Sequence, residues 1–367
     1  MRRLFEKCEI HGKDFQNRFV RSATFEGLAD DEGYPTPGLT DLIKSLVRGG
    51  VGLVITGHTF VQKVGRATPF QLSLDRDECI SPLKKMTDSV HRNNGRIFVQ
   101  LSHAGAFARP QEEGLSVLSV SGAGNFSAVS QREMTTPDIE DIVRCFGSAA
   151  RRAKEAGFDG IELHAAHGYL FSQFLSPAFN HRKDAYGGSL PNRVRALAET
   201  VREVRNTVGK DYPIIAKMNG NDYTEGGMTV QDSVAAAKIL AEVGIDGIEV
   251  SGGLLTSRTG GPSRSGIESE EQEAYFSREA RIMRKETGLP VILVGGIRSL
   301  AVAENIVEEG TADLIAMSRP FIREPDLVNR WKNGDCVRSA CVSDNRCFRP
   351  ALTGKGIYCV HERRRKR

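Results

Sequence analysis

The 367-residue chain contains no run of about 18 consecutive apolar residues, so the sequence offers no membrane-spanning helix. Its first residues mix apolar and charged side chains where an apolar stretch would be needed, and no secretory signal peptide is expected. Seven cysteines, an odd number, do not predict a disulfide framework. These absences together predict reduced thiols in a cytoplasmic protein with no membrane partner.

A large excess of charge of one sign is also missing. The formal net charge at pH 7 is +4, and residues 363–367 are all arginine or lysine, so the rest of the chain carries about −1. We therefore expect no nucleic-acid partner and interpret the basic end as a solvated, frayed terminus. The 40% hydrophobic and 26% charged residues are ordinary for a globular protein with a large core.

Short apolar runs alternate with longer amphipathic stretches along the chain. The runs predict strands at 19–22, 52–56, 96–101, 160–163, 213–218, 246–251, 290–294 and 313–317. The stretches predict helices near 40–49, 80–94, 137–156, 190–208, 229–243, 269–287, 298–309 and 324–332. Eight strands, each followed by a helix, predict an α/β protein with a closed (β/α)8 TIM barrel. An open doubly wound sheet is the alternative, but the Gly-x-Gly-x-x-Gly turn that favours it is absent after the first strand.

Two connections are unusually long, and both follow strands, so we expect them on the functional rim of the barrel. They cover 102–135 and 252–268 and are rich in glycine, serine and threonine. The second is either a mobile substrate lid or a disordered surface loop. We expect the barrel to occupy 1–333 and a C-terminal extension with cysteines and the basic tail to occupy 334–367.

Two histidines and a tyrosine follow the strand expected at 160–163. His164, His167 and Tyr169 would lie at the carboxyl edge of that strand, where TIM barrels keep their chemistry. The group is a candidate for catalysis or ligand binding, and a structural histidine pair is the open alternative. A metal site is less favoured, because no third nearby carboxylate or thiolate completes it.

Glycines and an arginine follow the last two expected strands. Gly295 and Gly296 come after the seventh strand, and Ser318 and Arg319 come after the eighth. TIM barrels often bind phosphate between these two loops, with backbone N–H groups that glycine exposes and an arginine that closes the cage. The pair of motifs predicts a ligand that carries phosphate, and two tight surface turns are the alternative.

Two polar side chains are expected to enter the barrel mouth. Gln100 ends the third strand and Lys217 ends the fifth. Because a buried lysine or amide needs a partner, we predict that a planar heterocycle with carbonyl and ring-nitrogen acceptors satisfies both. Two rim residues held by neighbouring loops would explain either position taken alone.

The chain resembles the old yellow enzyme family. The resemblance rests on 164–177 and 180–193, supported by 17–24, 100–105 and the turns near 295 and 319, and it spans 15 to about 325. It implies a barrel that binds FMN non-covalently, is reduced by NADH or NADPH, and is reoxidised by an electron-poor alkene. It therefore implies an ene-reductase, an NAD(P)H-dependent flavin oxidoreductase acting on a small α,β-unsaturated carbonyl-type molecule.

The resemblance also implies a role for each site residue. Ser22, Ala23 and Thr24 would line the flavin ring, with His58 near its edge, while Gln100 and Lys217 would face its pyrimidine end. Gly295, Gly296, Ser318 and Arg319 would hold the phosphate. His164 and His167 would donate hydrogen bonds to the carbonyl of the substrate, and Tyr169 would be the proton donor.

The sequence departs from the family at its C-terminal end. Cys341, Cys347 and Cys359, with Cys336 upstream, are similar to the four-cysteine iron–sulfur segment of the 2,4-dienoyl-CoA reductase branch. Asp344 occupies the place of one ligand, and no second flavin domain is expected. A cubane cluster normally needs four thiolates. We therefore expect neither a cluster nor a metal, although Cys336 as a substitute ligand, or zinc held with His361, are the alternatives.

Two further departures lie in the barrel. Some members have a tyrosine near the substrate shortly after the first strand, and residues 25–27 offer none, with Phe25 directly after Thr24; Lys217 stands where many members have arginine. The absent tyrosine and the altered cysteine segment motivate an alternative, a flavin- or metal-binding protein with little turnover. A third hypothesis is an aldolase-like barrel that binds phosphate and uses Lys217 as a Schiff-base lysine. A homo-oligomer remains open.

Overall fold

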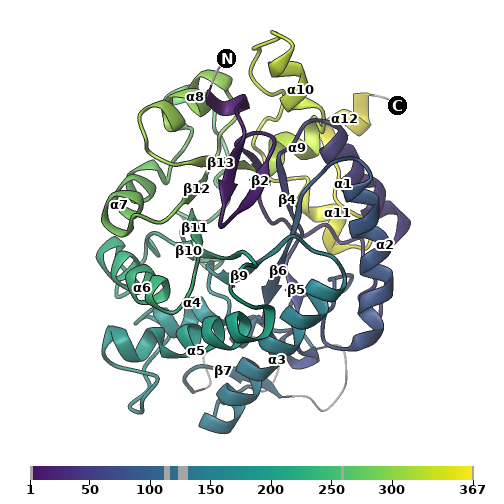
Figure 1. The fold of residues 1–367 in the computed structure, drawn as a ribbon. Coiled ribbons are helices and arrows are strands. Elements are labelled where there is room, and N and C mark those ends of the chain that lie inside the picture. Colours follow the sequence, from purple (N-terminus) through teal and green to yellow (C-terminus); the bar gives the residue numbers. More distant parts are fainter. Residues whose placement is uncertain (1–2, 111–115, 123–130, 258–259, 366–367) are drawn as a thin grey trace.

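A computed structural model describes residues 3–110, 116–122, 131–257 and 260–365, and its centre is a ring of eight parallel strands. The strands are β3 (Phe19–Arg21), β4 (Leu53–Ile55), β6 (Ile97–Ser102), β9 (Gly160–Ala165), β10 (Ile214–Asn219), β11 (Gly247–Ser251), β12 (Val291–Val294) and β13 (Leu314–Met317). The ring closes because β13 pairs with β3 and β4 pairs with β6. All eight strands lie where they were predicted, and the predicted TIM barrel is confirmed (Figure 1).

The main helices form a layer around this ring (Figure 1). They are α1 (Pro37–Arg48), α2 (Ile80–His91), α3 (Thr136–Glu155), α5 (Leu190–Val208), α6 (Val230–Glu242), α7 (Ser277–Thr287), α8 (Leu300–Glu308) and α10 (Leu327–Lys332). Capping boxes start α3, where Thr135 pairs with Asp138, and α6, where Thr229 pairs with Asp232. Each box satisfies backbone N–H groups that the helix itself leaves unpaired.

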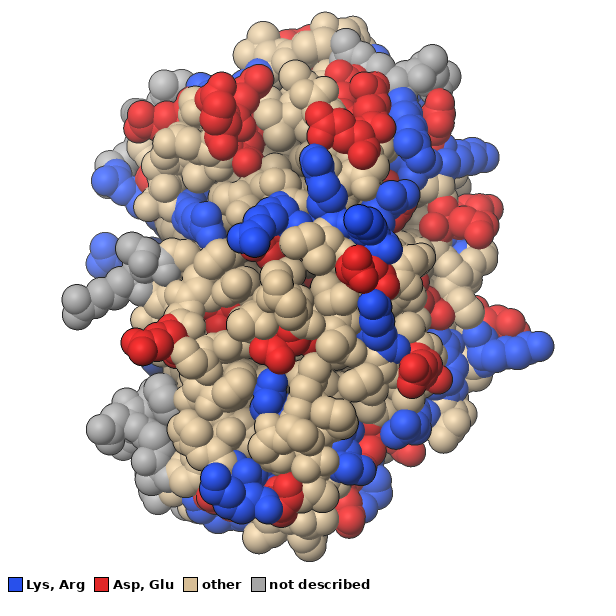
Figure 2. Space-filling view, turned by 90° about the vertical axis from the view of Figure 1, so that its left-hand side faces the viewer, with Lys and Arg blue, Asp and Glu red and all other residues tan. Residues whose placement is uncertain are grey.

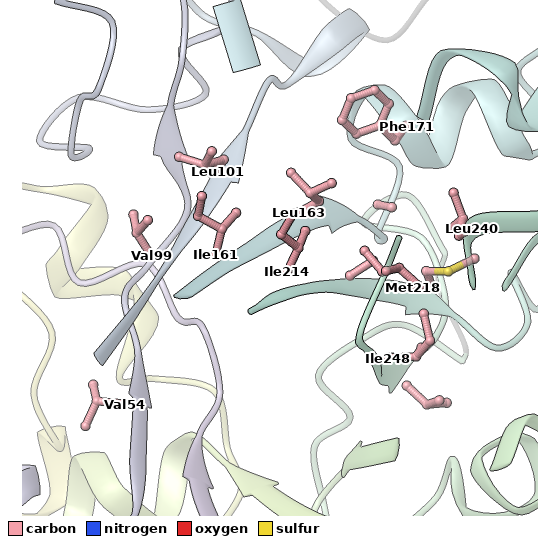
Figure 3. Close-up of a cluster of buried hydrophobic side chains, with 14 of the residues drawn as sticks. Val54, Val99, Leu101, Ile161, Leu163, Phe171, Ile214, Met218, Leu240 and Ile248 are labelled. Carbon is pink, nitrogen blue, oxygen red and sulfur yellow. The ribbon is translucent and has the colours of Figure 1, made fainter. Parts of the chain in front are cut away.

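Side chains alternate between the two faces of each barrel strand. In β6, Val99 and Leu101 point outward to the helices, and in β9, Ile161 and Leu163 do the same (Figure 3). Because the side-chain period of a strand is two, the residues between them point into the barrel. The outer positions are apolar and build the core between strands and helices, whereas several inner positions near the carboxyl end are polar.

The amino end of the barrel is closed by a hairpin that the sequence did not predict. Strands β1 (Cys8–Ile10) and β2 (Lys13–Phe15) pair antiparallel, and they are drawn in purple in Figure 1. Ile10 and Phe15 are buried in one apolar cluster with inner strand residues such as Phe98. The rings of Phe15 and Phe98 lie 6.0 Å apart. This apolar plug leaves the carboxyl end as the side from which a ligand reaches the barrel.

Shorter strands and helices lie in the connections and in the C-terminal segment. They are β5 (Thr59–Phe60), β7 (Val117–Ser119), β8 (Gln131–Glu133), α4 (Leu170–Leu175), α9 (Arg319–Arg323), α11 (Phe348–Leu352) and α12 (Val360–Arg365), with short 3-10 turns between the larger elements. Of the two long connections, 111–115, 123–130 and 258–259 lie outside the described residues, as do 366 and 367 of the basic tail.

The C-terminal segment packs against the start of the barrel. Cys347, Ala351 and Ile357 form a small apolar cluster with Phe25 and Leu42. In Figure 1 the yellow α11 accordingly lies beside α1, which carries Leu42. This segment therefore reaches the edge of the carboxyl end.

None of the helices in the described part of the chain combines the length and the apolar character needed to cross a bilayer. On the face seen in Figure 2, acidic and basic side chains are interspersed.

Candidate active site

One cavity at the carboxyl end of the barrel collects the predicted site residues. Its volume is about 360 Å³, which falls in the range of about 300–1,000 Å³ typical of small-molecule sites. It is lined by Ser22, Ala23, Thr24, His58, Gln100, His164, His167, Tyr169, Lys217, Gly296, Ser318 and Arg319. Of the predicted residues only Gly295 does not line it, and the adjacent Gly296 does.

His164 and His167 form an edge-to-face pair at the cavity wall. Their ring centroids lie 5.3 Å apart with an interplanar angle of 81°. Burial lowers the pKa of both imidazoles well below the ordinary value, and for His164 the nearby His167 lowers it further. Both rings are therefore neutral at pH 7, and a neutral imidazole donates one hydrogen bond and accepts another.

Backbone conformation and hydrogen bonds orient the two imidazole rings. His164 lies in β9 with its side chain inside the barrel, and its buried Nδ1 has no hydrogen-bond partner. His167 has a left-handed backbone with φ of 66°, and its Nε2 lies 2.8 Å from Oγ of Ser251. Its backbone N–H donates to Oδ1 of Asn219 at 3.1 Å. A strained residue held by contacts on both sides is typical of functional sites.

Tyr169 and His58 continue the aromatic wall. The Tyr169 ring lies 4.8 Å from His164 and 5.4 Å from His58, measured between centroids. Burial raises the pKa of Tyr169 to about 12, so its phenol keeps its proton at neutral pH. Burial lowers the pKa of His58 to about 4, so this ring is neutral.

A glutamine determines which nitrogen of His58 carries the proton. Oε1 of Gln71 accepts from the backbone N–H of Ala67 at 2.8 Å, which turns its amide nitrogen toward His58. That nitrogen donates to Nδ1 of His58 at 2.7 Å. Because Nδ1 accepts, the neutral ring holds its proton on Nε2.

The floor of the cavity is a buried polar layer. Nζ of Lys217 donates to Oγ of Ser22 at 2.7 Å and to Oε1 of Glu249 at 2.9 Å. Nε2 of Gln100 donates to Oε2 of Glu162 at 2.6 Å. Both predicted residues thus have protein partners, and their contact with a heterocycle stays a prediction. An ammonium group has three N–H donors, and Lys217 keeps one for a ligand.

The pKa values of the two carboxyl groups of this layer are shifted in opposite directions. Burial, followed by the negative charge of Glu249, raises the pKa of Glu162 well above its ordinary value. Lys217 and the hydrogen bonds to Glu249 hold the pKa of Glu249 below its ordinary value, against the effect of burial. Glu162 is therefore protonated and Glu249 ionised, and the layer with Lys217 is electrically neutral.

The opposite end of the cavity presents two buried guanidinium groups. Nη1 of Arg319 donates to the backbone oxygen of Arg264 at 2.7 Å and to Oδ1 of Asn345 at 2.9 Å. Arg298 donates to the backbone oxygens of Ile267 and Ser339, and its Nε is buried without a partner. Within the described residues, neither group forms an ion pair with a carboxylate. Two buried cations without a counter-ion favour an anion such as phosphate.

Gly296, two residues before Arg298, lies in close contact with the ring of Tyr275. A Cβ on Gly296, whose φ is 73°, would come within 2.6 Å of Cε1 of Tyr275. Any side chain there would have to displace that ring. The site therefore fits a planar group over the polar floor with a phosphate at the arginine end.

Two carboxyl groups of the polar layer and several residues that line the cavity were not predicted as site residues. Glu162 lies two residues before His164 and Glu249 lies two before Ser251, so the period of two in a strand places each on the inner face. A charged residue in the middle of an apolar strand is the sequence feature that could have identified these two glutamates. Unpredicted residues that do line the cavity include Ser343 and Phe348, which come from the C-terminal segment, where no motif marks them.

The cysteines of that segment gather beside the same end. Cys341, Cys347 and Cys359 line one small cavity with Asp344 and His361. Oδ2 of Asp344 lies 2.8 Å from Nε2 of His361. Among the residues that the structure describes, no group of three or more histidines, cysteines or carboxylates is placed to hold a metal ion.

Comparison with known proteins identifies relatives along nearly the whole barrel. The chain is 37% identical over 334 residues to an NADH oxidase of Thermoanaerobacter brockii, covering 90% of this chain and 51% of that protein. It is 34% identical over 325 residues to an NADPH dehydrogenase of Bacillus subtilis, covering 88% and 92%. The chain thus spans about half the length of the first relative and most of the second.

Solved structures show the same fold. The complex of 2-naphthoyl-CoA reductase superposes with a TM-score of 0.90 at 26% identity, covering 97% of this chain and 56% of that one. Histamine dehydrogenase from Rhizobium sp. gives 0.87 at 26% identity, covering 97% and 52%. An old yellow enzyme homologue from Zymomonas mobilis gives 0.76 at 25% identity, covering 93% and 95%.

The family itself is identified over residues 3–336, which match the sequence model described as the NADH:flavin oxidoreductase / NADH oxidase family. This match confirms the resemblance to old yellow enzyme, and with it the expected cofactors, because the family binds FMN and uses NADH or NADPH. The chain therefore belongs to the NADH:flavin oxidoreductase / NADH oxidase family.

Proposed function

We propose that the protein is an FMN-dependent ene-reductase that reduces the activated C=C bond of an α,β-unsaturated carbonyl compound with electrons from NADH or NADPH. The observation that carries the proposal is the wall of neutral imidazoles and a protonated phenol over one cavity. Bound FMN would supply the hydride chemistry, with electrons taken from the nicotinamide. The chain's own residues would bind, orient and donate protons.

The two ends of the cavity fit the two ends of that cofactor. Lys217 has one free N–H donor on the polar floor, where it would face acceptors of the ring. A cation there stabilises negative charge that develops nearby. Arg298, Arg319 and the turn at Gly296 would hold the phosphate.

His164 and His167 would act as hydrogen-bond donors to the carbonyl oxygen of the substrate. Hydride addition to the β-carbon moves negative charge onto that oxygen, so donors already in place stabilise the transition state more than the substrate. Both rings are neutral, so each can turn one N–H toward the oxygen without giving up its proton. Loss of one such donor typically lowers the rate by about 10²–10³-fold.

Tyr169 would then protonate the α-carbon. Its phenol carries a proton through the neutral range, because the pKa is raised to about 12. Its ring packs edge to face on His164, and this contact supports Tyr169 as the proposed proton donor beside the proposed carbonyl donors. General acid catalysis of this kind contributes about 10²–10⁴-fold.

Oxidation of an amine is the second candidate, because histamine dehydrogenase is among the structural relatives. The electrostatics favour the alkene instead. Burial is the main cause of the lowered pKa values of the three histidines in the wall, and the same loss of solvent disfavours a cation such as an alkylammonium. A neutral, electron-poor substrate meets no such penalty.

The decisive test is an anaerobic assay of the purified protein loaded with FMN. NADPH or NADH should bleach the flavin absorbance, and 2-cyclohexenone or N-ethylmaleimide should restore it. Tyr169→Phe should slow the second step by about 10²-fold or more and leave the first unchanged. Tyr186→Phe is the matched control, because its hydroxyl contacts Glu199 outside the cavity. Rapid reduction with no reoxidation by any alkene would favour a flavin-binding protein with little turnover, and reduction by histamine would favour amine oxidation.

A further inference from the structure

Three segments that are distant in the sequence meet around Arg319. They are the loop at 260–266, the residues after β13, and the turn at 343–345 in the C-terminal segment. Arg319 is 6% exposed and lines the cavity. The turn thus contacts the guanidinium group that would bind the phosphate.

Asn345 holds all three segments through its side-chain amide. Its Oδ1 accepts from Nη1 of Arg319 and from Oγ of Ser263, both at 2.9 Å. Its Nδ2 donates to the backbone oxygen of Ser263 at 2.8 Å. Nη1 of Arg319 has two N–H donors, and the second reaches the backbone oxygen of Arg264. Both donors of this nitrogen therefore have fixed directions.

The backbone of the turn supports the same arrangement. Ser343 and Asn345 are both left-handed, with φ of 53° and 61°. The backbone oxygen of Ser343 accepts from Gly266 at 3.1 Å, which fastens the turn to the loop. Asparagine adopts this conformation more readily than most residues.

The contacts orient the arginines without neutralising them. Arg319 donates to an amide oxygen and a backbone oxygen, and Arg298 donates to the backbone oxygens of Ile267 and Ser339. All of these acceptors are uncharged. The positive charge of Arg319 remains for an anionic ligand, whereas a carboxylate in place of the amide would compete with that ligand.

We propose that Asn345 is a positioning residue for the cofactor phosphate, and that the C-terminal segment completes the phosphate site by orienting Arg319. The proposal rests on the proposed function in taking FMN as the ligand. Asn345 acts through Arg319 and not through the flavin ring. Its effect therefore depends on whether the flavin carries a phosphate.

Equilibrium binding of FMN and of riboflavin to the full-length apoprotein, measured by quenching of flavin fluorescence, tests this role. Asn345→Gly removes the amide and keeps the left-handed backbone, so FMN binding should weaken about tenfold with riboflavin binding unchanged within about twofold. Asn345→Asp keeps an acceptor for Arg319 but adds a negative charge. It should weaken FMN binding further, again without affecting riboflavin.

Asn94 provides the matched control. It is an exposed asparagine with φ of 59° in the connection before β6, at the opposite end of the barrel. Asn94→Gly and Asn94→Asp should leave both affinities unchanged.

The outcomes separate this inference from the proposed function. Equal losses for FMN and riboflavin in the Asn345 variants, or an Asn345→Asp variant that binds FMN as tightly as the wild type, would overturn the positioning role. A wild-type protein that binds neither flavin would overturn the proposed function itself.

Discussion

Replacing the two buried glutamates by glutamine, singly and together, tests the charge assigned to the cavity floor. Glu162 is protonated, and glutamine matches a protonated carboxyl group in shape and charge. Glu162→Gln should therefore change the free energy of unfolding by about 1 kcal/mol or less. In Glu249→Gln the remaining carboxyl, Glu162, takes over the negative charge but lies farther from Lys217 in the hydrogen-bond network, so an intermediate loss is expected.

The double replacement leaves Lys217 buried without any counter-charge. Removal of one partner of a buried ion pair costs about 3–5 kcal/mol, so the double variant should lose more than the two single variants added together. A further Lys217→Met change removes the ammonium and should recover most of this loss. The chain has a single tryptophan, the buried Trp331, so denaturant titrations can be followed by its fluorescence together with circular dichroism.

The protonation of Glu162 also predicts how the free energy of unfolding depends on pH. A carboxyl group whose pKa is raised on folding stabilises the folded state fully below the ordinary glutamate pKa, and this contribution is lost as the pH rises through the raised pKa. Wild type should therefore lose stability relative to Glu162→Gln as the pH increases above the ordinary glutamate value. A loss of several kcal/mol in Glu162→Gln at pH 7, with no pH trend, would show that both carboxyl groups are ionised and would refute the assignment.

Three further results are expected. His164→Ala should lower the rate of alkene reduction by about 10²–10³-fold while reduction by NADPH is unchanged, which stopped-flow absorbance separates. Because burial lowers the pKa of His58, His164 and His167 below the ordinary histidine value, the rate of the alkene step should not change as the pH passes through that value, and a fall in rate centred there would contradict this. Gly296→Ala should abolish flavin retention on gel filtration, because its Cβ meets the Tyr275 ring and its backbone is left-handed; full retention of yellow colour would contradict the close approach assigned to this turn.

The barrel could be predicted because each strand is a short apolar run that a turn ends and an amphipathic helix follows. The hairpin of β1 and β2 could not, because its two strands have three residues each and carry charged side chains such as Glu9 and Asp14. Its stability comes from Ile10 and Phe15, which are buried against barrel residues far away in the sequence. Tertiary packing, not local propensity, forms it.

The candidate site also has a part that was predictable from the sequence and a part that was not. The chemistry of His164, His167 and Tyr169 is concentrated in six consecutive residues, and parallel strands bring Gln100 and Lys217 to the same edge, so this part was predictable. The protonation of Glu162 depends on a neighbour two strands away, and no spacing reveals it. Contacts such as that of Asn345 with Arg319 depend on where the C-terminal segment folds back, which a sequence pattern does not specify.

A crystal structure of the protein loaded with FMN would show where the flavin lies. Its density should cross the cavity, with the ring over Gln100 and Lys217, the phosphate between Arg298 and Arg319, and His164 and His167 facing the open side of the ring. A flavin bound elsewhere, or a phosphate remote from both arginines, would refute the cofactor site proposed for this barrel.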